Sequence, residues 1–107
     1  MQEQVDGFNA RNLEGFLRCY SSDAVLTDGT GNIMMQGRDA IRGFYAKLFA
    51  DSPNLHVEIP SRVHVGSWVI DEEHVTGFNF EGFPPEMHAA VIYHVQNGEI
   101  VRAMLLM

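Results

Sequence analysis

The sequence has little cysteine, no cluster of positive charge and no targeting signal. Cys19 is the only cysteine, so no intramolecular disulfide can form and we expect a reducing compartment. Seven Lys and Arg residues are scattered among fourteen Asp and Glu residues, giving a net charge of −7. Because a phosphate backbone requires concentrated positive charge, the sequence predicts no nucleic-acid partner.

Signals for a membrane or for export are also missing. Gln2-Glu3-Gln4 stands where a basic and then apolar leader would begin, and no apolar run approaches bilayer-spanning length. We therefore expect no membrane partner and a cytoplasmic location. Apolar residues make up 46% of the chain and charged residues 20%, which is typical of a packed globular protein. At this length we expect one domain over residues 1–107.

Motifs for covalent, nucleotide and metal chemistry are absent as well. The sequence contains neither a Gly-x-Ser-x-Gly nucleophile turn nor a Gly-rich loop followed by Lys-Ser or Lys-Thr. The histidine pairs that share strand parity, His56 with His64 and His88 with His94, are separated along a strand by roughly 20 Å or more. We therefore expect no metal and no cofactor.

Apolar spacing predicts helices near the start of the chain. An i, i+3, i+4, i+7 pattern runs from Leu13 to Tyr20, and Asn12 can cap the helix that carries it. Residues 1–20 are thus predicted to form a bent or two-part helix. A second helix, with the same spacing from Ile41 to Phe49, is predicted to end at Asp51-Ser52-Pro53.

The other segments have the character of strands. Ala24–Thr27 and Ile33–Gln36 are predicted to form a hairpin across a Gly-rich loop. The acidic run Asp71-Glu72-Glu73 is interpreted as a solvated edge that discourages pairing with other chains. Helices followed by a strand meander predict an α+β fold with helices on one face of a curved sheet. The meander is predicted at 55–59, 63–65, 68–80, 87–95 and 100–107, with turns at 66–67, 82–85 and 97–98.

This order resembles the ketosteroid isomerase and SnoaL-like branch of the NTF2-like superfamily. The likeness covers nearly the whole chain. It rests on a helix ending at Tyr20, a strand from Ser22-Asp23-Ala24 to Asp28, a Gly-rich turn and a helix opening Gly37-Arg38-Asp39-Ala40-Ile41. The resemblance implies a cystatin-like cone that holds a small apolar molecule. It also implies a cofactor-independent enzyme, of isomerase or cyclase type, that transfers a proton on an apolar carbonyl compound.

The alternative is a non-catalytic module that binds a ligand or stabilises a homodimer. Residues 55–107 carry apolar side chains on both faces of their strands, among them Val63, Ile70 and Ile92. Because the helices can cover only one face, we expect the outer face to pair two copies of the chain.

Asp28 is the candidate catalytic residue, because the strand-ending general base of ketosteroid isomerases falls on it. The resemblance implies a carboxylate at the mouth of an apolar cavity, made more basic by partial desolvation. From the residues alone, an Asp before Gly is also a common turn former that accepts backbone N–H bonds. An ordinary low pKa fits the turn, whereas a raised pKa fits the base.

The resemblance also implies the residues that contact the substrate. Tyr20 and Tyr45 match tyrosines of a hydrogen-bonded network behind the oxyanion hole. The two oxyanion donors themselves fall on Gln4 and near Val91, so steroid isomerase activity is not expected, although Tyr93 could offer a hydroxyl on the same strand face. With strand parity placing Arg102 outside, the predicted substrate-binding residues are Gln4, Phe16, Tyr20, Tyr45, Val91, Tyr93, Ala103, Leu105 and Met107.

Overall fold

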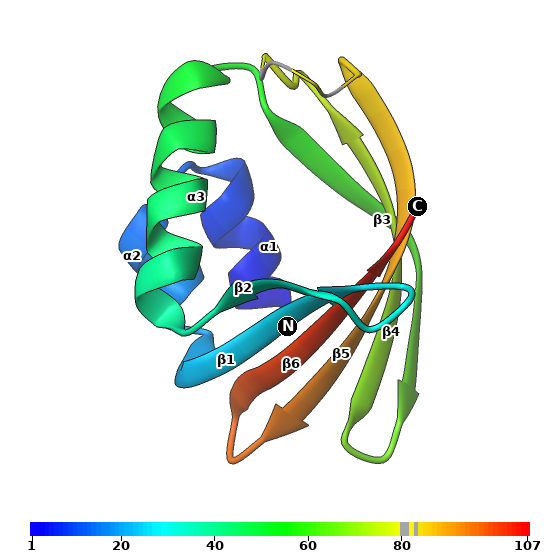
Figure 1. The fold of residues 1–107 in the computed structure, drawn as a ribbon. Coiled ribbons are helices and arrows are strands. Elements are labelled where there is room, and N and C mark those ends of the chain that lie inside the picture. The colour runs from blue at the N-terminus through cyan, green and yellow to red at the C-terminus, as the bar shows by residue number, and fades with distance from the viewer. Residues whose placement is uncertain (80–81, 83) are drawn as a thin grey trace.

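In the part of the chain that the structure describes, three helices pack on one face of a six-stranded sheet, which curves around them like part of a cone (Figure 1). The computed structural model describes residues 1–79, 82 and 84–107. This is the predicted α+β architecture. In chain order the elements are α1 (Gln2–Asn9), α2 (Leu13–Leu17), β1 (Tyr20–Asp28), β2 (Ile33–Gln36), α3 (Arg38–Asp51), β3 (His56–Val65), β4 (Trp68–Thr76), β5 (Glu86–Gln96) and β6 (Glu99–Leu106).

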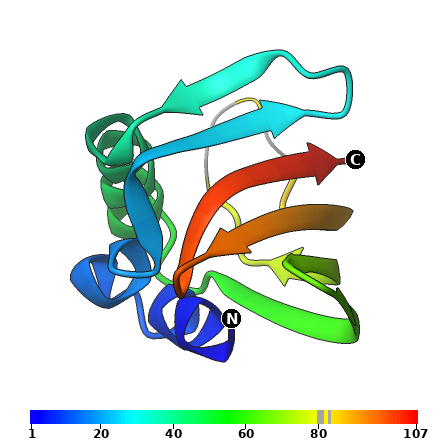
Figure 2. The ribbon, with the colours of Figure 1, turned by 90° about the horizontal axis from the view of Figure 1, so that it is seen from below.

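The sheet is mixed, with strand order β2-β1-β6-β5-β4-β3. β1 and β6 are parallel, and every other neighbouring pair is antiparallel. Seen from below, the strands follow one another in this order with the helices gathered along one side (Figure 2). Within the described residues, no helix is long and apolar enough to cross a membrane.

The first helical segment has two parts, as predicted. Asn12 caps α2, since its Oδ1 accepts the Gly15 N–H at 3.1 Å. Gly7 lets the two helices approach closely, because a Cβ added there would lie 2.7 Å from the Phe16 backbone nitrogen. The predicted end of the helix at Tyr20 is wrong. α2 ends at Leu17, and Tyr20 starts β1, where it pairs with Ile100 of β6.

The strands follow the predicted hairpin and meander with three differences. The β1–β2 hairpin is present, but β1 begins four residues earlier than expected. The predicted segments 55–59 and 63–65 are one strand, β3, whose register shifts between Glu58 and Ser61. Pro60 lies in this irregularity, and an edge strand tolerates proline there because no ladder N–H is required. The next strand, predicted to run to residue 80, ends at Thr76 as β4, because Gly77 takes a positive φ of 81°. Phe80, and Phe83 of the predicted 82–85 turn, lie outside the described residues.

The core lies between the helices and the concave face of the sheet. Phe16 and Ile41 are fully buried, and Tyr20 retains 2% of its exposed area. Rings from α1, α2 and α3 pack against one another, with centroids 4.6 Å apart for Phe16 and Tyr45 and 5.5 Å apart for Phe8 and Phe49. Because such contacts add to the burial of apolar area, this aromatic cluster anchors the helices on the sheet.

Candidate active site

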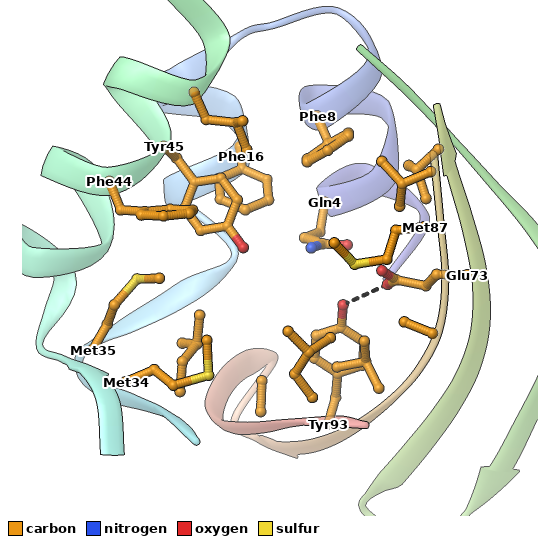
Figure 3. A pocket seen from close by; sticks show the side chains of 18 of the residues that line it. Gln4, Phe8, Phe16, Met34, Met35, Phe44, Tyr45, Glu73, Met87 and Tyr93 are labelled. Carbon is orange, nitrogen blue, oxygen red and sulfur yellow. Dashed lines mark hydrogen bonds between the residues drawn. The ribbon is translucent and has the colours of Figure 1, made fainter. Parts of the chain in front are cut away.

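A pocket of about 150 Å³ opens between the helices and the concave face of the sheet (Figure 3). Fully or almost fully buried lining residues, among them Phe16 and Tyr20, define the inner end, and the most exposed, Met34 and Met107, define the mouth. The lining is almost entirely apolar. It includes every residue predicted to contact substrate, although the contact itself stays a prediction: Gln4, Phe16, Tyr20, Tyr45, Val91, Tyr93, Ala103, Leu105 and Met107.

Among the described residues, one carboxyl group lines this pocket, that of Glu73. It comes from β4, where Val69, Asp71, Glu73 and Val75 share one parity and point to the concave face. Tyr93 on the neighbouring strand β5 donates its hydroxyl proton to Glu73 Oε2 at 3.0 Å (Figure 3).

The surroundings of Glu73 make it a weak acid. Burial raises its pKa to about 7, and the nearby negative charge of Asp71 acts in the same direction. The hydrogen bond from Tyr93 and the charge of Arg62 lower the pKa, but they offset only part of the desolvation. Glu73 can therefore both hold and release a proton near neutral pH.

Two further tyrosine hydroxyls belong to the pocket. Gln4 Nε2 donates to the Tyr20 hydroxyl oxygen at 3.2 Å, so Tyr20 can still donate its own proton. The Tyr45 hydroxyl points into the pocket (Figure 3) and has no hydrogen-bond partner among the described residues. Burial raises the pKa of both phenols, so both are hydrogen-bond donors at neutral pH.

A buried ion pair lies beside Glu73. Asp71 is fully buried, and its two carboxylate oxygens accept from Arg62 Nε at 2.7 Å and from Arg62 Nη2 at 2.8 Å. Arg62 lies directly opposite Asp71 in the β3–β4 register. This two-point geometry fixes both side chains and ties the edge strand to its neighbour.

Asp28 is not part of the pocket lining. Its Oδ1 accepts three hydrogen bonds within the β1–β2 turn, from the Thr30 N–H at 2.9 Å, the Thr30 hydroxyl at 2.6 Å and the Asn32 N–H at 3.0 Å. The bonds from Thr30 are the largest cause of a lowered pKa. The expected raised pKa at the rim of an apolar cavity is therefore wrong, and the geometry is that of an Asx turn.

Sequence reasoning missed Glu73 and Asp71 because three consecutive acidic residues were interpreted as a solvated edge. Only Glu72 of this run faces the outer side, where its Oε2 lies 2.6 Å from His88 Nε2. A signal for the inward placement was present. Val69 and Val75 share strand parity with Asp71 and Glu73. A strand that buries the two valines therefore also turns both carboxyl groups toward the buried face.

Helices packed on a coned mixed sheet, with an apolar pocket between the layers, define an α+β protein of the cystatin-like or NTF2-like class. The family model of the SnoaL-like domain matches residues 1–103, so this chain belongs to that family. A search among curated proteins found no match.

Solved structures share the fold at low sequence identity. A cystatin-fold protein from Novosphingobium aromaticivorans has a TM-score of 0.88 and 24% identity, over 99% of this chain and 93% of that one. A candidate polyketide cyclase from Sinorhizobium meliloti has a TM-score of 0.78 and 18% identity, over 96% and 89%. TerC, co-crystallised with polyporic acid, has a TM-score of 0.77 and 16% identity, over 97% and 85%. Members of this fold thus include a protein crystallised with a small organic molecule.

Proposed function

We propose that this chain is a cofactor-independent enzyme that transfers a proton on an apolar carbonyl compound, with Glu73 as the proton-transferring group. The observation that carries the proposal is the Glu73 carboxyl in a mostly apolar pocket, 3.0 Å from the Tyr93 hydroxyl. A pKa of about 7 suits an acid–base group that works near neutral pH. The candidate polyketide cyclase among the structural neighbours is consistent with chemistry on a carbonyl compound.

The reaction uses two sets of polar groups in the pocket, the carboxyl group of Glu73 and the tyrosine hydroxyls. Glu73, as the carboxylate, takes a proton from a carbon next to the carbonyl, and the C–H electron pair moves to the carbonyl oxygen to give an enolate. Tyr45 and Tyr20 donate hydrogen bonds to that oxygen, where negative charge develops. Glu73 then returns the proton to another carbon, which gives an isomer of the same composition. Tyr93 holds the carboxylate in place throughout.

The test compares two conservative variants in the same reaction. Deuterium uptake from heavy water next to the carbonyl of cyclohex-2-enone is followed by NMR. Glu73→Gln keeps the shape of the side chain but cannot accept a proton, so we expect the rate to fall at least about a hundredfold. Asp28→Asn keeps an acceptor oxygen for the turn, and we expect no change in rate.

The opposite result would favour Asp28, the base that the resemblance implies. If Asp28→Asn abolishes exchange and Glu73→Gln does not, Asp28 is the base and our assignment of Glu73 is wrong. If wild-type protein binds the ketone but produces no exchange at any pH, the pocket belongs to a non-catalytic binding module.

The outer face of the sheet favours a second role, the pairing of two copies of the chain. Val63, Ile70, Ile92 and Met104 form a row across β3, β4, β5 and β6, because the register pairs each with the next. Val63 is 48% exposed and Ile70 is 37% exposed. We propose that this row is the core of a homodimer interface, in a cytoplasmic protein as the single cysteine suggests. Dimerisation is compatible with either role of the pocket.

A further inference from the structure

We propose that the substrate of this pocket is an uncharged carbonyl compound with a single ring. This inference rests on the proposed function for the carbonyl group, but ring number and charge follow from the pocket itself. Three features carry it: the volume of the cavity, the packing of its inner end and the kinds of polar atom that face it.

The volume admits one ring. The cavity of about 150 Å³ equals the size at which an engineered apolar cavity in another protein binds benzene. A six-membered ring with a carbonyl oxygen fills this space. Additional fused rings would have to project through the mouth, where Met34 is 46% exposed and Met107 73% exposed.

The inner end cannot widen easily to admit a larger ligand. Phe16 has no exposed area, and its ring lies 4.6 Å from Tyr45, 5.3 Å from Tyr20 and 5.7 Å from Phe49, measured between centroids. Each ring is therefore held by others from different helices and from β1. In a close-packed interior, moving one ring displaces its neighbours, so the size limit is set by the fold.

The polar atoms favour a neutral ligand with an acceptor oxygen. No Lys, Arg or His belongs to the described lining, and the single carboxyl group is that of Glu73. An anionic ligand would be buried without a partner, next to a group that itself becomes negative. A cation would find one carboxylate but would also face the hydroxyl protons of Tyr20 and Tyr45, which suit an oxygen.

The test measures binding, so that it does not depend on turnover. Dissociation constants are measured by NMR titration of the wild-type protein. The probes are cyclohex-2-enone, a two-ring fused enone, a four-ring steroid 4-en-3-one, cyclohex-1-enecarboxylate and cyclohexylammonium. We expect saturable binding of the one-ring enone. The fused enones and both ions should bind at least about tenfold more weakly.

Two neighbouring leucines of β6 supply a matched pair of variants. Leu105 lines the pocket, whereas Leu106 has the opposite parity and lies outside it. Leu105→Ala enlarges the pocket, so we expect the two-ring enone to gain at least about tenfold relative to the one-ring enone. Leu106→Ala removes the same atoms from the surface and should leave this ratio unchanged. The folded state of each variant is checked by its NMR spectrum.

Each outcome separates the substrate class from the proposed function. One-ring binding without any deuterium exchange supports the substrate class and overturns proton transfer. Binding of the four-ring enone at least as tightly as the one-ring enone, with exchange that depends on Glu73, overturns the substrate class and leaves proton transfer intact. Preferred binding of either ion, or the absence of any enone binding, overturns the inference.

Discussion

Glu73 holds its proton more tightly in the folded protein than in the unfolded chain, and this difference links stability to pH. Its pKa rises from 4.5 to about 7 on folding, chiefly because burial penalises the carboxylate. Between these values the folded state binds a proton that the unfolded state has lost, so this group's contribution falls as pH rises. The contribution of Glu73 to the free energy of unfolding is complete below pH 4.5 and is lost as the pH rises past 7. It amounts to about 3 kcal/mol over this window.

Glu73→Gln should remove this pH dependence. We expect the variant to gain stability relative to wild type as the pH is raised from 4 to 8, because a neutral amide needs no proton. Urea unfolding at several pH values measures the difference. A constant difference between the two proteins across this range would show that Glu73 ionises in the folded state as it does in the unfolded chain.

The sequence predicts the lining of the pocket better than its chemistry. The apolar spacing of the first helix, the strand parity of the last two strands and the resemblance together named nine residues that do lie around the pocket. The carboxyl group was placed on Asp28, because a single sequence does not show whether an Asp at a strand end accepts bonds from its own turn. Glu73 was overlooked because the acidic composition of residues 71–73 was given more weight than the strand parity, which places Glu73 on the buried face.

At the scale of elements, the Arg62–Asp71 pair joins the edge strand β3 to β4. Arg62→Met would leave the fully buried Asp71 carboxylate without its partner. Breaking a buried pair in this way costs about 3–5 kcal/mol, and we expect the lower end because the Arg62 side chain is 20% exposed. Urea unfolding measures the loss.

A double variant separates charge burial from loss of packing. Arg62→Met with Asp71→Leu removes both charges and keeps apolar volume, so we expect it to recover most of the lost stability. If the double variant is as unstable as Arg62→Met alone, the pair stabilises the protein mainly because its hydrogen bonds fix the geometry of the two strands.

The elements themselves were predicted well where local signals are strong. The Asn12 cap, the apolar spacing from Ile41 to Phe49 and the turn at 97–98 each mark a boundary that the structure contains. Tyr20 was assigned to a helix because its spacing from Leu13 fits one. Its partner in the sheet, Ile100, is eighty positions away along the chain, and no local pattern reveals such a pairing.

At the scale of the molecule, the apolar row on the outer face predicts a dimer in solution. Sedimentation at micromolar concentration should give twice the 12.0 kDa mass of the chain. Ile70→Lys places a charge in the centre of the row and should give a monomer, since an unpaired charge in an interface core is costly. Ala50→Lys, on the exposed side of α3, serves as the control. Wild-type protein that sediments as a monomer contradicts the proposal.

The position of β6 between β1 and β5 has a consequence for the order in which the sheet assembles during folding. Two half-sheets form from local contacts: the β2–β1 hairpin, and the antiparallel β3–β4–β5 meander. Each ends in an unpaired strand, β1 in one and β5 in the other, until residues 99–106 pair with both. Because β1 and β6 are far apart along the chain, their pairing is slow. Until they pair, the pocket lacks the wall that β6 contributes. Until β6 pairs with both, β1 and β5 leave rows of backbone N–H and C=O groups unpaired, and such edges are where partly folded chains associate with one another.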